Sequence, residues 1–330
     1  MFNLTAKPSA YSSAQAPRRE EAVSLTSKPC VVAIPARQVQ APRAGSRRAS
    51  FLVQASCASQ QGPAAQPRIC TLYEGSSPYN PNIQILECPL VGVPPEVAGA
   101  RMLILDFSGN PHSLYRQNDV VTGQYWDELA LVAAVAPPGP LAILGMGAGT
   151  VARIAHSISP QRVIHGWELD STVVDVARQF LGLQELEDSG HVVIHVGDAL
   201  SGDVTMDGGF AGIVVDIFVN GSLHNDLLQV DTWRRFADSL APGGRIIANL
   251  GSPPFPGTEH YPAVQKSQQA LEAMAGAFGG NVCYKYQMTN VGGSAIGMSG
   301  PLPLPVHCQS LPPRLRDCGN GWKHFSSMPQ

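Results

Sequence analysis

The sequence predicts an α/β protein with a mainly parallel, Rossmann-like sheet and a small antiparallel β unit in front of it. From residue 141 onwards, short apolar runs alternate with amphipathic helical segments. This alternation is typical of parallel strands joined by right-handed helical crossovers. A glycine or an acid stands where four of the apolar runs end, namely Gly145, Glu168, Asp198 and Asp216. Ligands of such sheets bind beyond the carboxyl ends of the strands, so these four positions are candidate site residues.

A glycine-rich loop joins the first parallel strand, residues 141–144, to the first helix, residues 151–158. The loop contains Gly145, Gly147 and Gly149. Without Cβ atoms the backbone can turn tightly and approach a ligand, and the following helix N-terminus presents free N–H groups. A glycine loop alone also occurs as an ordinary tight turn, so its context decides between a turn and a binding site.

The context here is a second strand, residues 162–167, which is followed by Glu168 and Leu169. Glu168 comes roughly twenty residues after the loop, the separation at which a carboxylate can bind a ribose diol. We therefore predict a nucleoside-binding βαβ unit. No later glycine completes the pattern G-x-G-x-x-G, because Thr150 and Val151 follow the loop. This favours S-adenosylmethionine or a relative over a dinucleotide, which needs a cradle for its pyrophosphate.

Composition restricts the class of protein. The chain has 330 residues, 44% hydrophobic and 14% charged, enough for one or two domains with a sizeable core. The net charge of −3 and the lack of a basic stripe give no support for nucleic acid as a partner. No apolar run reaches the ~18 residues of a membrane span. The seven cysteines form no C-x-x-C pair, so we expect reduced thiols and no metal site.

The N-terminal residues 1–55 are rich in Ala, Ser, Pro and Arg, and their only acids are Glu20 and Glu21. This composition is typical of an organelle transit peptide, and Val53-Gln54-Ala55 resembles a plastid processing site. We expect import into the chloroplast or another plastid, with the mature protein in the stroma. The alternative is a disordered tail without a targeting role.

The remaining chain divides into three expected parts. Residues 70–122 form a small N-terminal β domain, residues 123–300 the Rossmann-like domain, and residues 301–330 an irregular tail. In the first part, strands are expected at 69–73, 83–86 and 101–107, separated by turn residues. In the second part, helices are expected at 124–136, 172–181, 227–240 and 263–278, with a turn at Pro242-Gly243-Gly244. Further strands are expected at 191–196, 210–215, 245–250, 282–287 and 294–298.

The ordered motifs resemble the spermidine synthase family within the class I methyltransferase-like superfamily. They are Ser77-Pro78-Tyr79-Asn80, Leu105-Asp106, Tyr125 with Glu128, Gly145 to Gly149, Glu168-Leu169-Asp170, Gly197-Asp198-Ala199, Val214-Val215-Asp216 and Leu240-Ala241-Pro242-Gly243-Gly244. The resemblance covers roughly residues 70–300. It implies a spermidine synthase-like fold and a possible homodimer.

The resemblance also implies roles for individual residues. Ribose binding would fall to Glu168, adenine contacts to Asp198 and Ala199, and the position beside the sulfonium to Asp216. Asn80 and Tyr125 would line the far side of the substrate pocket.

The sequence departs from the family at acids that its chemistry uses. Ala148 replaces an acid inside the glycine loop, Val219 replaces the second acid after Asp216, and Asn110 stands where a hairpin glutamine is expected. Decarboxylated S-adenosylmethionine and polyamines are cations, and opposite charges at about 4 Å attract by roughly 4 kcal/mol at an effective dielectric near 20. An intact S-adenosylmethionine carries its own carboxylate, which Ala148 does not repel.

From these losses we expect a methyltransferase that uses S-adenosylmethionine, with Asp216 beside a small-molecule or protein acceptor. A polyamine aminopropyltransferase that uses decarboxylated S-adenosylmethionine is the alternative. A non-catalytic nucleoside-binding scaffold is a second alternative, because lost acids fit it as well.

Overall fold

The protein is described by a computed structural model that covers residues 68–289 and 292–325. These residues belong to one compact unit of the chain. The predicted transit peptide, residues 1–55, lies outside them. In the described part of the chain, no helix is long and apolar enough to cross a membrane.

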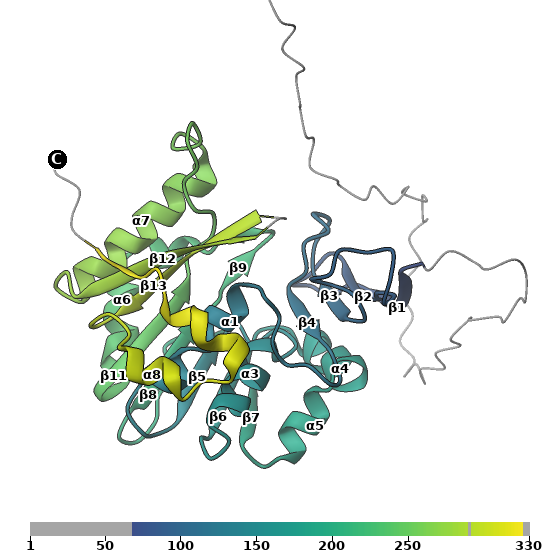
Figure 1. The fold of residues 1–330 in the computed structure, drawn as a ribbon, viewed down its shortest axis with the longest axis horizontal. Helices are drawn as coiled ribbons and strands as arrows, with labels where there is room; N and C mark the ends of the chain where they lie inside the picture. The colour runs from purple at the N-terminus through teal and green to yellow at the C-terminus, as the bar shows by residue number, and fades with distance from the viewer. Residues whose placement is uncertain (1–67, 290–291, 326–330) are drawn as a thin grey trace, which may run out of the picture. The chain divides into compact units, whose positions relative to one another are not determined.

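The small N-terminal sheet is an antiparallel meander of four strands in the order β1-β2-β3-β4 (Figure 1). Its strands are β1 (Cys70–Gly75), β2 (Ile83–Glu87), β3 (Arg101–Ile104) and β4 (Ser113–Tyr115). The three expected strands are present. The fourth strand, β4, was not predicted, because its three residues are too few to show an alternating pattern. Ile83, Ile85 and Leu103 are fully buried, so this sheet packs one apolar face inward.

The central sheet has eight strands in the order β14-β12-β13-β11-β8-β5-β6-β7. Five strands are parallel: β5 (Leu141–Leu144), β6 (Ile164–Glu168), β7 (Val192–Val196), β8 (Phe210–Val215) and β11 (Leu240–Asn249). Three are antiparallel: β12 (Val282–Thr289), β13 (Gly292–Ser299) and β14 (Lys323–His324). The predicted fold class is therefore confirmed.

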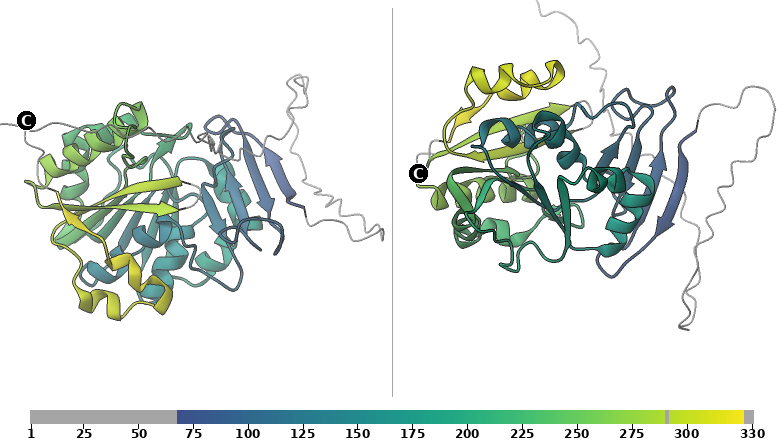
Figure 2. Two further views of the ribbon diagram at one scale, coloured as in Figure 1. Left: turned by 45° about the horizontal axis from the view of Figure 1, so that its top comes forward. Right: turned by 90° about the horizontal axis from the view of Figure 1, so that it is seen from below.

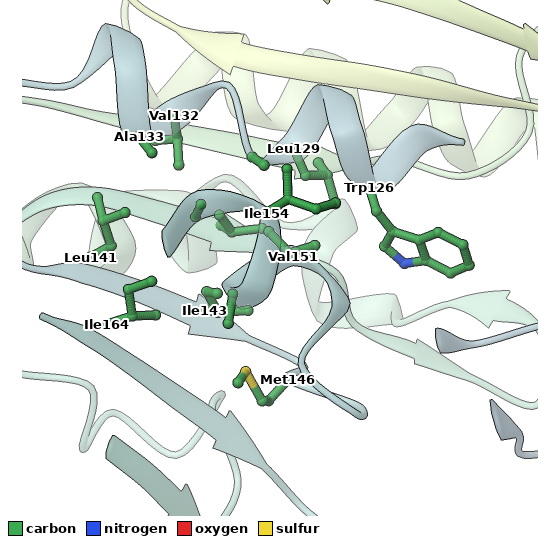
Figure 3. Packing of buried hydrophobic residues seen from close by; sticks show 14 of the residues in the cluster. Trp126, Leu129, Val132, Ala133, Leu141, Ile143, Met146, Val151, Ile154 and Ile164 are labelled. Carbon is green, nitrogen blue, oxygen red and sulfur yellow. The ribbon is translucent and has the colours of Figure 1, made fainter. Parts of the chain in front are cut away.

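Helices cover both faces of this sheet (Figures 1 and 2). One face packs against α1 (Tyr125–Leu129), α2 (Val132–Val135), α3 (Thr150–Ile158), α4 (Ser171–Phe180) and α5 (Leu183–Asp188). The other packs against α6 (Val230–Asp238) and α7 (Pro262–Ala277). Figure 3 shows the first core, where Leu129 and Ile154 from the helices meet Ile143 from β5.

The segment 124–136 forms two short helices instead of the expected single one. The N–H of Leu131 bonds to the carbonyl of Glu128 three residues back, which ends the regular α-helical ladder. Every residue from 126 to 133 is buried. Packing on all sides therefore decided this geometry, and a single regular helix over 124–136 does not describe it.

Two other elements differ from expectation near the same sheet. The Pro242-Gly243-Gly244 turn lies inside β11, where the pairing with β8 shifts register between Leu240 and Arg245. Helix α6 begins later than expected, because a 3-10 turn, η1 (Asn225–Leu228), precedes it. Between Asp216 and that turn, β9 (Phe218–Val219) and β10 (Ser222–Leu223) form a small hairpin.

The C-terminal segment is structured, contrary to the expected irregular tail. It contains α8 (Pro305–Gln309), a 3-10 helix η2 (Pro313–Gly319) and β14, which pairs with β12. Leu315, Cys318 and Trp322 are buried within it. The segment, yellow in Figure 1, lies beside α1. Its apolar side chains join the core that α1 helps to form, and their burial offsets the conformational cost of ordering the segment.

Candidate functional site

The candidate site lies where the parallel strands end. Strands β5, β6, β8 and β11 run in the same direction and are adjacent, so the residues that follow them meet at one edge of the sheet. The glycine loop follows β5, Glu168 ends β6, Asp216 follows β8, and Asn249 ends β11.

Each glycine of the loop is required by packing inside the chain. A Cβ on Gly145 would lie 2.2 Å from the carbonyl oxygen of Asp216, and one on Gly147 would lie 2.7 Å from Oγ of Ser113. A Cβ on Gly149 would contact Leu183 at 3.1 Å. All three glycines have positive φ, which other residues rarely adopt. The loop conformation thus follows from the protein's own contacts.

The backbone N–H groups of this loop are already hydrogen-bonded. Those of Gly145 and Met146 donate to the carbonyl of Trp167, and that of Gly149 donates to Met146. The N–H of Gly147 donates to Glu168, and that of Ala148 donates to Oγ of Ser113 at 2.9 Å. An anionic ligand group would therefore have to find its donors outside residues 145–149.

Glu168 is buried at the end of β6 and holds the loop. Its Oε2 accepts the Gly147 N–H at 2.8 Å, and its Oε1 accepts the Asp170 N–H at 3.1 Å. Burial raises the pKa of Glu168, and these backbone hydrogen bonds partly oppose the rise. Each carboxylate oxygen retains a further lone pair, so Glu168 can still accept a ribose hydroxyl. Leu169, which follows it, is exposed.

Asp198 and Ala199 follow β7. Oδ1 of Asp198 accepts the N–H of Leu200 at 2.8 Å, so the side chain closes its own turn while remaining exposed. Ala199 is buried and lines a cavity of about 460 Å³ between residues 199–209 and the C-terminal end of α6. Of the predicted site residues, Ala199 alone lines this cavity.

Asp216 is held by two side chains that the tertiary structure brings to it. Its Oδ1 accepts a hydrogen bond from Nδ2 of Asn249 at 3.0 Å, and its Oδ2 accepts one from the Tyr125 hydroxyl at 3.2 Å. Burial raises the pKa of Asp216 to about 7, although both hydrogen bonds favour the ionised form. Near neutral pH this carboxylate can therefore accept a proton.

Tyr125 and Asn249 complete a three-residue cluster around this carboxylate. Burial, together with the nearby Asp216 charge, raises the pKa of Tyr125 well above its ordinary value, so it remains a donor. Sequence reasoning assigned Tyr125 but missed Asn249. The same criterion that identified Asp216, a polar residue at the carboxyl end of an expected strand, could have found it.

Asn80 makes its contact with a different residue. Its Nδ2 donates to Oδ2 of Asp170 at 2.7 Å, and the Ser77 hydroxyl donates to the same oxygen. Asp170 also caps α4 by accepting the Thr172 N–H at 2.9 Å. Asn80 thus ties the small sheet to the loop after β6, so it reaches the edge of the site through Asp170.

The residues at the positions of the two lost acids differ in burial. Ala148 is buried, whereas Val219 is exposed in the β9–β10 hairpin. His224 and Asp226 follow that hairpin, where Nδ1 of His224 accepts the backbone N–H of Asp226 at 3.2 Å and lies 3.7 Å from its Oδ1. Within residues 68–289 and 292–325, no group of three or more His, Cys, Asp or Glu side chains could hold a metal ion.

A mainly parallel sheet with helices on both faces, and with polar residues gathered at its carboxyl edge, has the architecture of a class I methyltransferase-like fold, here with an added N-terminal β sheet. Comparison of structures then gives the particular fold. The chain is similar to a spermidine synthase from Thermotoga maritima (TM-score 0.54, 16% identity, covering 77% of this chain and 80% of that one). It is equally similar to a probable spermidine synthase from Corynebacterium glutamicum (0.54, 16%, 80% and 99%).

A third similar structure is a spermidine synthase in complex with the transition state analogue AdoDATO (TM-score 0.53, 16% identity, covering 77% and 80%). No family model matches the chain, and no curated protein matches it. The fold of this chain is therefore the spermidine synthase fold.

Proposed function

We propose that this protein transfers an alkyl group from an adenosyl sulfonium to an amine, with Asp216 as the base. Aminopropyl transfer from decarboxylated S-adenosylmethionine is the specific reaction that we favour. The observation that carries the proposal is the Asp216 carboxylate, whose pKa is raised to about 7 at the carboxyl end of β8 and which is fixed by Tyr125 and Asn249.

The residues at the sheet edge suit an adenosyl donor. Glu168 has unused lone pairs for a ribose hydroxyl, and Asp198 and Ala199 follow the strand next to it. A bound adenosyl sulfonium would supply an electrophilic carbon and a thioether leaving group. The amine nitrogen would form a bond to this carbon while the carbon–sulfur bond breaks and its electron pair stays on sulfur.

Asp216 supplies the proton acceptor that an amine requires. An alkylamine has a pKa near ~10, so it is mostly protonated at neutral pH and cannot attack. A carboxylate whose pKa lies near the working pH is an effective base for removing that proton. The Tyr125 hydroxyl and the Asn249 amide orient the carboxylate by one hydrogen bond each.

The hydrogen bonds of the glycine loop favour the decarboxylated donor. The N–H groups of residues 145–149 are all used within the chain, so they offer nothing to the carboxylate of an intact S-adenosylmethionine. The similarity of the fold to spermidine synthases supports the same choice.

Methyl transfer from S-adenosylmethionine is the second candidate, and Ala148 is the observation that favours it. A buried alanine replaces an acid at this loop position, so a donor amine gains no carboxylate there. Asp216 would still serve as the base for an amine acceptor.

Binding and turnover together test these candidates. Isothermal titration of the purified chain with the two donors should give tighter binding of the decarboxylated one, and putrescine should then yield an aminopropylated product by mass spectrometry. Asp216→Asn should abolish turnover and keep donor binding, whereas Asp231→Asn on the exposed side of α6 should change neither. Methylated amines would establish the second candidate. Binding without any turnover would establish a nucleoside-binding scaffold.

We also propose plastid import, which rests on the composition of residues 1–55 alone. A fluorescent protein fused behind residues 1–60 should enter plastids. A signal confined to the cytosol would contradict this proposal and would leave the reaction untouched.

A further inference from the structure

A buried ion pair joins the helix that carries Tyr125 to β12, a strand near the antiparallel edge of the central sheet. Nζ of Lys285 on β12 lies 2.7 Å from Oε1 of Glu128 on α1. The two side chains are only 13% and 9% exposed. In such surroundings an ion pair is strongly directional, because neither partner can turn to water instead.

The same ammonium group also holds the C-terminal segment. Lys285 donates to the carbonyls of Cys318 at 3.3 Å and Asp317 at 3.4 Å, both in η2. The indole N–H of Trp322 donates to the Cys318 carbonyl as well, at 2.8 Å. Lys285 therefore has its three donors shared between α1 and η2.

Further contacts surround this junction. Gln287, two residues along β12, donates to the carbonyl of Gly123 just before α1 at 3.4 Å. Arg314 of η2 pairs with Asp119 at 2.6 Å. The segment that leads into α1 is thus attached to β12 and to η2 at several points. The position of α1 in turn fixes where the Tyr125 hydroxyl lies.

We propose that Lys285 is a positioning residue for the Asp216 site. It clamps α1 between β12 and the C-terminal segment 311–322, and so keeps the Tyr125 hydroxyl on the Asp216 carboxylate. The effect of the clamp on catalysis rests on the proposed function, whereas its effect on α1 does not.

The groups that face each carboxylate are few. Asp216 faces Tyr125 from α1 and Asn249 from β11. Glu128 faces Lys285, Asp127 and Cys318. Loss of the clamp would free the Tyr125 hydroxyl, and Asp216 would keep the Asn249 hydrogen bond alone. Because the Tyr125 bond lowers the pKa of Asp216, its loss should raise that pKa.

The first test needs no activity. In Lys285→Met, amide hydrogen exchange of residues 122–131 should be at least ~10-fold faster than in the wild type, because α1 loses its anchor. Lys285→Arg should restore slow exchange, since it keeps a cationic donor. Lys323→Met, an exposed lysine on the neighbouring β14, is the matched control and should exchange like the wild type. Unchanged exchange in Lys285→Met would overturn the proposal.

The second test uses the reaction. Lys285→Met should bind the donor within ~3-fold of the wild type, lose about tenfold in kcat at pH 7, and show the acidic limb of its kcat–pH profile at higher pH. Lys285→Arg should restore kcat and return the acidic limb of the kcat–pH profile to its wild-type position. If Lys285→Met lost binding of the adenosyl donor while the acidic limb of its kcat–pH profile stayed in place, the defect would be a general structural one. That result would contradict a positioning role.

A third variant covers the case in which Lys285→Met fails to fold. Glu128→Gln combined with Lys285→Met removes both charges, so no buried charge is left unpaired, and the clamp is still absent. It should show the same fast exchange. If the wild type turns over no amine, the proposed function is wrong. The hydrogen-exchange result still tests whether Lys285 holds α1 in place.

Discussion

Tyr125 and Asp216 lie 91 residues apart in the chain, yet the Tyr125 hydroxyl donates a hydrogen bond of 3.2 Å to the Asp216 carboxylate. The contact joins α1, which precedes the first parallel strand, to the loop after β8. Because the hydrogen bond favours the ionised carboxylate while burial disfavours it, the pKa of Asp216 comes to lie near 7, where it matters for proton transfer.

The first prediction concerns the pH dependence of Asp216. Its carboxylate is the active form, so kcat should rise with pH and level off above about 7. Since the folded pKa exceeds the unfolded one, the wild type loses stability as pH rises from the unfolded pKa through about 7. Asp216→Asn cannot titrate, so its melting temperature relative to the wild type should increase between pH 5 and pH 8. A constant difference across that range would refute the raised pKa.

The second prediction concerns Tyr125. Tyr125→Phe removes one hydrogen bond to a charged group, worth about 1.5–3 kcal/mol in general, and so should raise the pKa of Asp216. The acidic limb of the kcat–pH profile should move upward, and kcat at pH 7 should fall about tenfold or more. Tyr261→Phe, at an exposed tyrosine just before α7, is the control. An unmoved limb would show that the hydroxyl does not act on Asp216.

The third prediction concerns Glu168. Glu168→Gln places an amide where two backbone N–H groups need acceptors, so one of them must lose its partner. A buried N–H group without an acceptor costs about 1–3 kcal/mol of stability. As the loop loosens, binding of the adenosyl donor should weaken by about tenfold or more. Calorimetry and thermal unfolding measure these two effects. Glu185→Gln on α5 should leave both unchanged, and equal behaviour of the two variants would remove Glu168 from the site.

The fourth prediction separates packing from backbone strain in the glycine loop. Gly145→Ala would place a Cβ 2.2 Å from the Asp216 carbonyl in addition to a φ of 87°. Gly190 has a φ of 75° with no atom within 4 Å of its Cβ position, so Gly190→Ala should cost only the strain of about 1–2 kcal/mol. Gly145→Ala should destabilise the protein much more in chemical denaturation. Similar losses for both would mean that the loop can move away from Asp216.

The local sequence was sufficient to predict the parallel sheet and most of the site residues at the carboxyl ends of its strands. Apolar runs of four to six residues, interrupted by Gly145, Glu168 and Asp216, are short-range signals of buried strands and of the ends where ligands bind. Such signals depend only on residues that are close in the sequence, so they can be recognised without knowledge of the fold.

The tertiary structure decided which side chains meet at that edge. Asn249 reaches Asp216 because β11 pairs with β8, and Asn80 reaches Asp170 because β2 of the small sheet packs against α4, the helix that Asp170 caps. Lys285 meets Glu128 across 157 residues of chain. None of these pairs has a spacing that the sequence could reveal, because a contact between distant segments depends on how whole elements pack. The sequence by itself therefore determined the α/β scaffold and the carboxyl edge at which the site lies. The tertiary packing alone determined the burial of Asp216 and its hydrogen bonds with Tyr125 and Asn249, which set its pKa.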